Sequence, residues 1–276
     1  MKRLPRFYLR TRLRVARLRI LDAWDVLTRQ RLPMTPSRVR IAAVGGGDFR
    51  ALGEHLAQLL IEAGQLQPHE RVLDVACGVG RVAVPLTRYL KSGEYTGFDV
   101  SAPAIKWCRR AISSQHPNFS FIRVDVFNSH YNPRGKIQPA QFTFPCANES
   151  VDVAFLGSIL THLTPDAAAQ YVAETSRVLK PRGRAVMTFF LLDESVRDKS
   201  RHGYLVPTFS TYPEPWWAIQ DPQDPEAAVA YDISVVKEAL GARNLEIMEV
   251  SRGGWSAHAN SRTYQDLIVA CKRPSN

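Results

Sequence analysis

The stretch RVLDVACGVGRVAVPLTRYL, residues 71–90, decides the fold. It opens with an apolar run interrupted by one acid, Asp74, which is typical of a buried strand. Gly78 and Gly80 follow and predict a tight turn, and apolar residues at three- and four-residue steps then predict a helix that reaches Leu90. A strand, a glycine turn and a helix in this order are typical of an α/β unit with a ligand at the helix N-terminus.

Strands and helices alternate along the rest of the chain. Apolar runs predict further strands over 95–100, 119–126, 151–158, 184–192, 245–251 and 264–271, and apolar faces predict helices over 49–60, 105–112, 165–179 and 232–241. Because parallel neighbours need a crossover, the alternation predicts an α/β fold with a mostly parallel, doubly wound sheet. Ligands of such sheets bind at the carboxyl ends of the strands.

Positive charge is concentrated in residues 1–40. They hold twelve of the 36 lysines and arginines and two of the 26 acids, so the formal charge of +10 belongs to this segment. A second stripe is apolar and follows helical spacing: Leu9, Leu13, Ala16, Ile20, Trp24 and Leu27. We expect a basic amphipathic N-terminal helical arm over 1–40, with its helix ending near Pro33, and a main domain over 41–276.

The basic arm leaves three interpretations open: a helix on an anionic lipid surface, a contact for a phosphate-bearing substrate or RNA, and a helix packed over the ligand pocket. Each basic residue near a charged bilayer adds about 1 kcal/mol to binding. The apolar stripe favours lipid or core over RNA, and the neutral body disfavours a nucleic-acid partner. We therefore expect peripheral contact with anionic membrane through residues 1–40.

The cysteines, Cys77, Cys108, Cys146 and Cys271, lie far apart without the paired spacing of metal ligands. This argues against a metal site and a disulfide framework, so we expect a cytoplasmic protein. Arginines recur up to Arg19 and interrupt any apolar core of a secretory signal, although an arginine-rich, acid-poor start also resembles a transit peptide. No apolar run is long enough to span a bilayer.

Three aspartates stand at or near the ends of successive predicted strands: Asp74, Asp99 and Asp125. In a parallel sheet they would lie along one edge. Carboxylates suit a nucleoside with ribose hydroxyls, an amine and a cationic tail, whereas they repel a pyrophosphate. The glycine turn alone leaves a dinucleotide site open, because Gly78 to Ala83 also fits G-x-G-x-x-A with Asp99 about twenty residues on.

In these segments the chain resembles class I, Rossmann-like S-adenosyl-L-methionine-dependent methyltransferases. The likeness covers residues 68–192, with a looser match to the end. It rests on the joint order of VLDVACGVG (72–80), YTGFDVS (95–101), FIRVDVF (121–127), FTFPCANESVDVAFLGSILTHL (142–163) and RVLKPRGRAVMTFF (177–190). The resemblance implies a seven-stranded sheet, S-adenosyl-L-methionine as cofactor and S-adenosyl-L-homocysteine as product.

The resemblance also implies roles for individual residues. The methionyl part of the cofactor would be held by Asp74 and the backbone near Ala76, Cys77, Gly78 and Gly80. Asp99 would accept both ribose hydroxyls. The adenine amine would donate to Asp125, with Val100 and Val126 bracketing the ring. Leu156 would lie beside the cofactor. Two departures are visible: alanine replaces the commonest glycine at 76, and the fourth strand lacks the Asn/Asp-Pro-Pro-aromatic signature of enzymes that methylate adenine or glutamine amino groups.

A hydroxyl acceptor would need a base, and His162 follows the fourth predicted strand on the cofactor side. The alternative is a helix-start residue that only packs near the pocket. Residues 193–230 hold five aromatic residues among five prolines and predict an acceptor lid without regular structure, or ordinary core cover. Tyr131-Asn132-Pro133 and Gly254-Trp255 are further candidates for the acceptor pocket.

We therefore predict a methyltransferase acting on a small-molecule acceptor, with an oxygen of a sugar, lipid or secondary metabolite as the favoured class. Two alternatives stay open. One is an NAD-dependent oxidoreductase that uses the same glycine turn. The other is a catalytically silent methyltransferase-like module that binds a partner through the basic arm.

Overall fold

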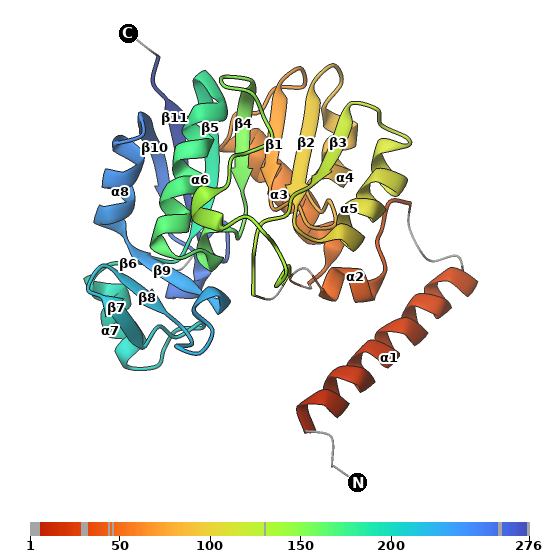
Figure 1. Ribbon diagram of the computed structural model, residues 1–276, viewed down its shortest axis with the longest axis horizontal. Coiled ribbons are helices and arrows are strands. Elements are labelled where there is room, and N and C mark those ends of the chain that lie inside the picture. Colours follow the sequence, from red (N-terminus) through yellow and green to blue (C-terminus); the bar gives the residue numbers. More distant parts are fainter. Residues whose placement is uncertain are drawn as a thin grey trace.

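The computed structural model describes residues 6–28, 33–43, 45, 47–129, 131–258 and 261–274. Its centre is a seven-stranded sheet in the order β10-β11-β5-β4-β1-β2-β3 (Figure 1). The strands are β1 (Arg71–Val75), β2 (Glu94–Asp99), β3 (Phe119–Arg123), β4 (Val151–Leu156), β5 (Leu179–Phe189), β10 (Leu245–Ser251) and β11 (Asp266–Lys272). Because β11 runs antiparallel to both its neighbours, the sheet is mixed, and the predicted mostly parallel α/β architecture is confirmed.

The strand order reverses at β1, which pairs in parallel with β2 on one side and with β4 on the other. The chain first builds outward through β2 to β3 and then returns to add β4 and β5 on the opposite side. The connection that follows β1 therefore leads toward one edge of the sheet, and the connection that follows β4 leads toward the other edge. The carboxyl ends of these strands form the switch point where open α/β sheets bind ligands.

Successive side chains of a strand point to opposite faces of the sheet. Both faces of this sheet are apolar, and helices cover both of them. Leu73 and Val75 of β1 belong to the core on one face, and Val72 belongs to the core on the other. The first core contains residues of α6 (Pro165–Val178) and α8 (Ile233–Gly241). The second contains residues of α3 (Phe49–Glu62), α4 (Ala83–Tyr89) and α5 (Ala102–Cys108). Packing on both faces fixes where the strands end.

Several element boundaries differ from the sequence prediction. β5 begins at Leu179, directly after α6, whereas the strand predicted from the sequence began at residue 184. The register between β4 and β5 jumps from the pair Val151–Leu179 to the pair Val153–Arg184, so the residues around Pro181 bulge out of the ladder. A proline in a bulge removes no ladder hydrogen bond, which explains why the strand tolerates it.

Residues 193–230 were predicted to lack regular structure, and that prediction was wrong. The segment contains a helix and contributes strands to a second sheet in the order β6-β9-β8-β7. These elements are β6 (Leu191–Leu192), α7 (Glu194–Arg201), β7 (Thr211–Glu214), β8 (Trp217–Ile219) and β9 (Val229–Asp232). The strands are short, and a proline lies within β7, so they lack the alternation that identifies a strand from sequence.

The described part of residues 1–40 is helical in two places, α1 (Arg6–Leu27) and α2 (Arg38–Ala42), and α2 was not predicted. Asp22 accepts the backbone N–H of Arg38 at 2.8 Å, and Asp25 pairs with the Arg38 guanidinium at 2.9 Å. The two acids of the basic segment thus attach α1 to α2, at one corner of the molecule (Figure 1). Among the helices described, none has the length and apolar character needed to cross a membrane.

Candidate functional site

Two cavities with shared walls open at the carboxyl ends of β1, β2 and β4. The large cavity, about 760 Å³, includes Asp74, and the small cavity, about 190 Å³, includes Asp99. Six residues line both: Gly45, Ala76, Gly78, Gly157, Ser158 and His162. The glycine turn and the end of β4 therefore form the boundary between the two cavities, at the switch point of the sheet.

Asp74 is buried in β1, where the hydroxyl of Tyr95 donates a hydrogen bond to its carboxylate. Burial raises the pKa of Asp74 to about 7, the Tyr95 hydrogen bond opposes this shift, and the nearby charge of Asp99 adds to it. A buried carboxyl that titrates near neutrality gains from any cation that comes within a few ångströms of it. Asp74 lines the large cavity, where such a cation would sit.

Asp99 ends β2, and both its carboxylate oxygens accept backbone N–H groups. Oδ1 accepts from Ser101 at 2.7 Å, and Oδ2 accepts from Gly78 at 2.8 Å. Burial raises the pKa of Asp99, and the bonds from Ser101 and Gly78 lower it. A carboxylate has about four acceptor positions, so lone pairs remain for hydroxyl donors in the small cavity.

The turn after β1 places three residues in the left-handed region: φ is +62° at Ala76, +53° at Gly78 and +70° at Gly80. Such a conformation costs about 1 kcal/mol for alanine, and strain of this kind clusters at functional sites. Ala76 and Gly78 line both cavities, and Cys77 lines the large one. Gly80 lines neither, because it packs inward: a Cβ there would lie 2.8 Å from Ile112.

The remaining predicted cofactor residues divide into two groups. Val100 and Val126 line the small cavity, as does Tyr131 from the loop after β3. Asp125 and Leu156 line neither cavity. Leu156 is fully buried in the core. The structure thus brings together the two valines that were predicted to flank the adenine ring, whereas Asp125 and Leu156 lie outside both cavities.

Asp125 lies beyond the end of β3 and is bound by its own neighbours. Its carboxylate accepts from Nδ2 of Asn132 at 3.1 Å and pairs with the Arg123 guanidinium at 3.4 Å. The loop carbonyl of Asp125 also accepts the N–H groups of Lys136 and Ile137. These contacts shape the loop that carries Tyr131 over the small cavity.

His162 lies in a 3-10 turn (Leu160–His162) between β4 and α6 and lines both cavities. Its Nδ1 lies 2.9 Å from the backbone carbonyl oxygen of Glu226. Since a carbonyl only accepts, Nδ1 of the ring carries the proton and donates it in this bond. The neutral ring then keeps Nε2 as a proton acceptor, which is the tautomer that a general base needs.

Glu226, in the 3-10 turn Pro225–Ala227, was not singled out from the sequence. Its carboxylate accepts from Nδ2 of Asn128 at 3.1 Å and from the N–H and hydroxyl of Ser129 at 3.2 Å and 2.9 Å. One residue thus joins segment 193–230 to the loop after β3 and to His162. These partners are 98 and 64 residues away, so no local pattern could have revealed the contact.

Ser158, a second residue missed from the sequence, has φ of +61°. Its N–H donates to the Thr188 hydroxyl at 2.8 Å, and its own hydroxyl donates to Oε1 of Gln265 at 2.9 Å. All three side chains line the large cavity, so they tie together the regions following β4, within β5 and before β11. Of the predicted acceptor candidates, Gly254 lines this cavity, whereas Trp255 is buried in the apolar cluster of the second sheet.

The doubly wound seven-stranded sheet, with buried acids at the ends of its first two strands, defines the class I, Rossmann-like methyltransferase fold. Residues 72–183 match the family described as "Methyltransferase domain". This match covers less than half of the chain, and within it the chain is similar to that family. No group of three or more potential metal ligands occurs among the residues described.

Known relatives support the same family. A phthiotriol/phenolphthiotriol dimycocerosates methyltransferase of Mycobacterium leprae is 34% identical over 114 residues, 41% of this chain and 35% of that protein. A 2-phytyl-1,4-naphtoquinone methyltransferase of Nostoc is 27% identical over 148 residues, 52% of this chain and 57% of that protein. The alignment spans 35% of the length of the first relative and 57% of the length of the second, so both are covered to less than two thirds.

A solved structure with the same fold is the 1,6-didemethyltoxoflavin-N1-methyltransferase of Burkholderia thailandensis, bound to 1,6-didemethyltoxoflavin and S-adenosylhomocysteine. It superposes with a TM-score of 0.52 at 16% sequence identity, covering 80% of this chain and 79% of that chain. At this identity the match concerns the fold.

The Glu226 contacts predict that one side chain restrains the loop after β3. In Glu226→Ala, the Ser129 amide loses a charged acceptor, so we expect its hydrogen exchange to accelerate about tenfold. Hydrogen–deuterium exchange of the full chain measures this, with Glu214→Ala, an exposed glutamate of β7, as the matched control. Unchanged exchange over residues 127–131 in both variants would refute the restraint.

Proposed function

We propose that this chain transfers a methyl group from S-adenosyl-L-methionine to a small molecule. The observation that carries the proposal is the pair of buried carboxylates, Asp74 and Asp99, on the walls of two cavities that meet at the glycine turn. Asp99 would accept the ribose hydroxyls and Asp74 would face the ammonium group. Val100 and Val126 would flank the adenine ring in the small cavity.

The chemistry of these donors and walls fits the cofactor. Asp99 has acceptor positions left after its two backbone bonds, and a diol supplies two donors. The small cavity is walled mainly by apolar side chains, which suits a flat purine. An NAD cofactor fits less well, because its pyrophosphate would meet the negative charge of Asp99 beside Gly78.

The cofactor supplies the methyl group on a sulfonium, and the protein's part is to hold the acceptor in line with it and to exclude water. We assign the acceptor to the large cavity, which combines apolar walls such as Leu52 and Phe155 with the polar groups of Ser158 and Thr188. The names of the two relatives contain a lipid and a quinone acceptor. These features favour a largely apolar small molecule, and we propose a hydroxyl as the group that accepts the methyl.

Within this site we assign His162 as the base for that hydroxyl and residues 193–230 as a cover of the acceptor side. The Glu226 carbonyl fixes Nδ1–H, so Nε2 of His162 is free to take the proton. Glu226 belongs to residues 193–230. The packing of this segment and the orientation of the His162 ring therefore depend on each other.

The pKa of Asp74 generates a test of cofactor binding. A carboxyl with a pKa of about 7 is protonated near pH 5.5 and ionises as the pH rises toward neutrality. The ligand ammonium stays charged over this range, so we expect S-adenosyl-L-methionine to bind about tenfold more tightly at pH 7 than near pH 5.5. Calorimetry measures the affinity, and NAD should give no heat.

The matched control is Asp74→Asn, which should bind weakly at both pH values and lose the pH dependence. Tight, pH-independent binding by both proteins would remove Asp74 from the cofactor site. Binding of NAD in place of S-adenosyl-L-methionine would replace the methyltransferase proposal by the oxidoreductase alternative.

A second test concerns the base. We expect His162→Gln to lower the turnover rate about 100-fold, since general base catalysis contributes at least this much, while cofactor affinity stays unchanged. Release of S-adenosyl-L-homocysteine measures turnover with a panel of lipid, quinol and sugar hydroxyl acceptors. Full activity of the variant on any accepted substrate would leave His162 a packing residue.

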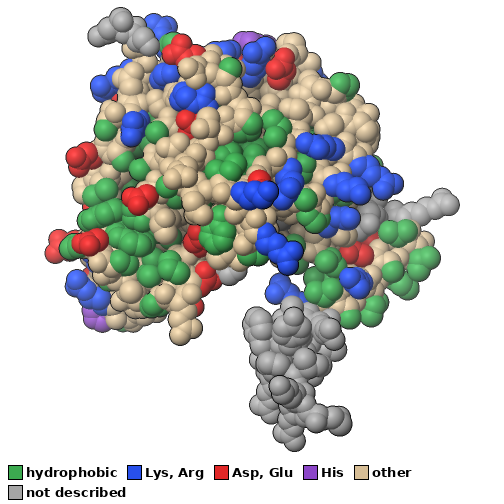
Figure 2. Space-filling view, in the orientation of Figure 1, with side chains coloured by type: hydrophobic (Ala, Val, Ile, Leu, Met, Phe, Trp, Pro, Cys, Tyr) green, Lys and Arg blue, Asp and Glu red, His purple; other side chains and the backbone are tan. Residues whose placement is uncertain are grey.

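We further propose that α1 lies on an anionic membrane surface. Val15, Leu18, Asp22 and Asp25 are partly buried on one face of the helix, whereas Ile20 is 70%, Trp24 61% and Leu27 80% exposed on another. Figure 2 shows hydrophobic side chains on the surface of the described part of α1. An apolar face flanked by arginines is the pattern of an interfacial helix.

Vesicle binding tests this proposal. Burying isoleucine and tryptophan side chains contributes about 1.5–3 kcal/mol each, so Ile20→Ser/Trp24→Ser should weaken binding to anionic vesicles at least about tenfold. The control Tyr204→Ser/Met248→Ser replaces two equally exposed apolar residues elsewhere. Co-sedimentation at low salt measures both, and equal binding of the two variants would end the proposal.

A further inference from the structure

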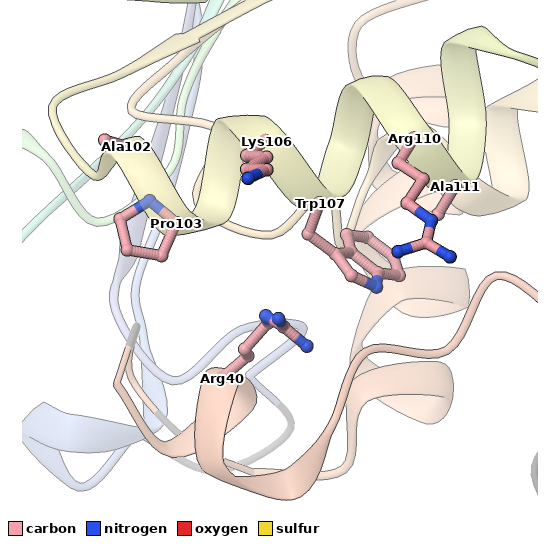
Figure 3. Close-up of a pocket in the computed structure, with 7 residues that line it drawn as sticks. All are labelled: Arg40, Ala102, Pro103, Lys106, Trp107, Arg110 and Ala111. Atoms are coloured by element: carbon pink, nitrogen blue, oxygen red, sulfur yellow. The ribbon is translucent and has the colours of Figure 1, made fainter.

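A separate cavity of about 760 Å³ lies between α2 and the helical stretch that begins with α5. Its walls are Arg40, Ala102, Pro103, Lys106, Trp107, Arg110 and Ala111. Figure 3 shows Arg40 reaching from α2 toward α5, with the Arg110 guanidinium beside the Trp107 ring. The cavity is thus lined by three cationic side chains and no acid.

The part of the chain that the structure describes provides no counterion for these three cations. Among the described residues, no ion pair or hydrogen bond involves the guanidinium groups of Arg40 and Arg110 or the ammonium group of Lys106. Their neighbour Arg109 is different, because its Nε donates to the Phe121 carbonyl at 2.7 Å. Lys106 and Arg110 stand four residues apart on one helix face, a spacing at which like charges repel. An anion between the helices would relieve this repulsion.

The wall of the cavity is fixed to the core. The Trp107 ring meets the buried Phe49 edge-on, with ring centroids 6.5 Å apart, and belongs to the margin of the second core. Arg40 lies in α2, whose neighbour Arg38 is held by Asp22 and Asp25 of α1. The cations therefore come from two elements, of which one packs against the core through Trp107 and the other is bound to α1 through Arg38. These contacts fix the distance between the two walls of the cavity.

We propose that this cavity binds a phosphate group. Guanidinium groups of Arg40 and Arg110 match the oxygens of a phosphate in two-point contacts, and Lys106 adds a point charge. The indole of Trp107 supplies an apolar surface for whatever carries the phosphate. The carrier is a lipid headgroup or a soluble phosphate compound, and the two share this recognition chemistry.

The site is independent of the methyltransferase proposal and lies beside α1, for which we propose contact with a membrane. Figure 2 shows lysine and arginine side chains gathered on the part of the surface formed around α2 and α5. A headgroup bound there would place the protein against the bilayer with α1 alongside. Failure of the phosphate site would leave cofactor binding at Asp74 and Asp99 untouched.

The test removes the three charges together in Arg40→Gln/Lys106→Gln/Arg110→Gln. The matched control is Lys91→Gln/Lys237→Gln/Arg243→Gln, which removes the same charge from exposed positions outside the cavity. Calorimetry with inorganic phosphate and glycerol phosphate, at constant ionic strength, should show affinity lowered at least about tenfold in the cavity variant and little changed in the control. The single variant Arg110→Gln, an exposed change, guards against a folding defect.

Vesicles distinguish the two carriers. If the cavity variant also loses binding to vesicles that contain phosphatidylglycerol, and the control does not, the carrier is a lipid headgroup. If vesicle binding is equal in the two variants while phosphate binding is lost in the first, the carrier is soluble. Absence of phosphate binding by the unaltered protein, or equal phosphate binding by both variants, overturns the proposal.

Discussion

The hydrogen bond from the Gly78 N–H to the Asp99 carboxylate holds the site together. It joins the turn after β1 to the end of β2, and the turn it fixes forms a wall of both cavities. The turn needs such a bond because its residues adopt left-handed conformations that no regular ladder stabilises. Without the carboxylate, a partly buried N–H would lose its partner at a cost of about 1 kcal/mol. The shape of the proposed cofactor pocket therefore depends on a carboxylate to which we also assign ligand binding.

Placing Asp74 and Asp99 in the interior has an electrostatic cost that explains their chemistry. Burial raises the pKa of both, and the charge of Asp99 raises that of Asp74 further. The protein offsets part of this cost with the Tyr95 hydroxyl and the N–H groups of Ser101 and Gly78. What remains is a site that prefers a ligand rich in donors and positive charge. The same pair of acids would disfavour an anionic cofactor.

Local pattern was enough to predict the parts of this site that belong to single elements. The alternation of strands and helices, the glycine turn and the positions of Asp74 and Asp99 follow from apolar periodicity and strand ends. Glu226 and the Ser158–Gln265 pair were beyond reach, because each joins segments far apart in the chain. Asp125 was placed at a strand end, yet β3 ends at Arg123 and the acid turns into its own loop. The strands of the second sheet are too short to show a period.

The small number of acidic residues in residues 1–40 explains why the basic side chains of this segment lack partners within it. Residues 1–40 contain two acids, Asp22 and Asp25, and both are used to attach α1 to Arg38. Among the described side chains, Arg14, Arg17 and Arg19 of α1 and Arg40 of α2 form no ion pair with an acid. The rest of the protein has balanced charge, so its own carboxylates pair elsewhere, as Glu70 does with Arg184. The anionic membrane that we propose as a partner would match both this excess charge and the apolar face carrying Trp24, because it offers phosphates and a hydrocarbon interior within one boundary.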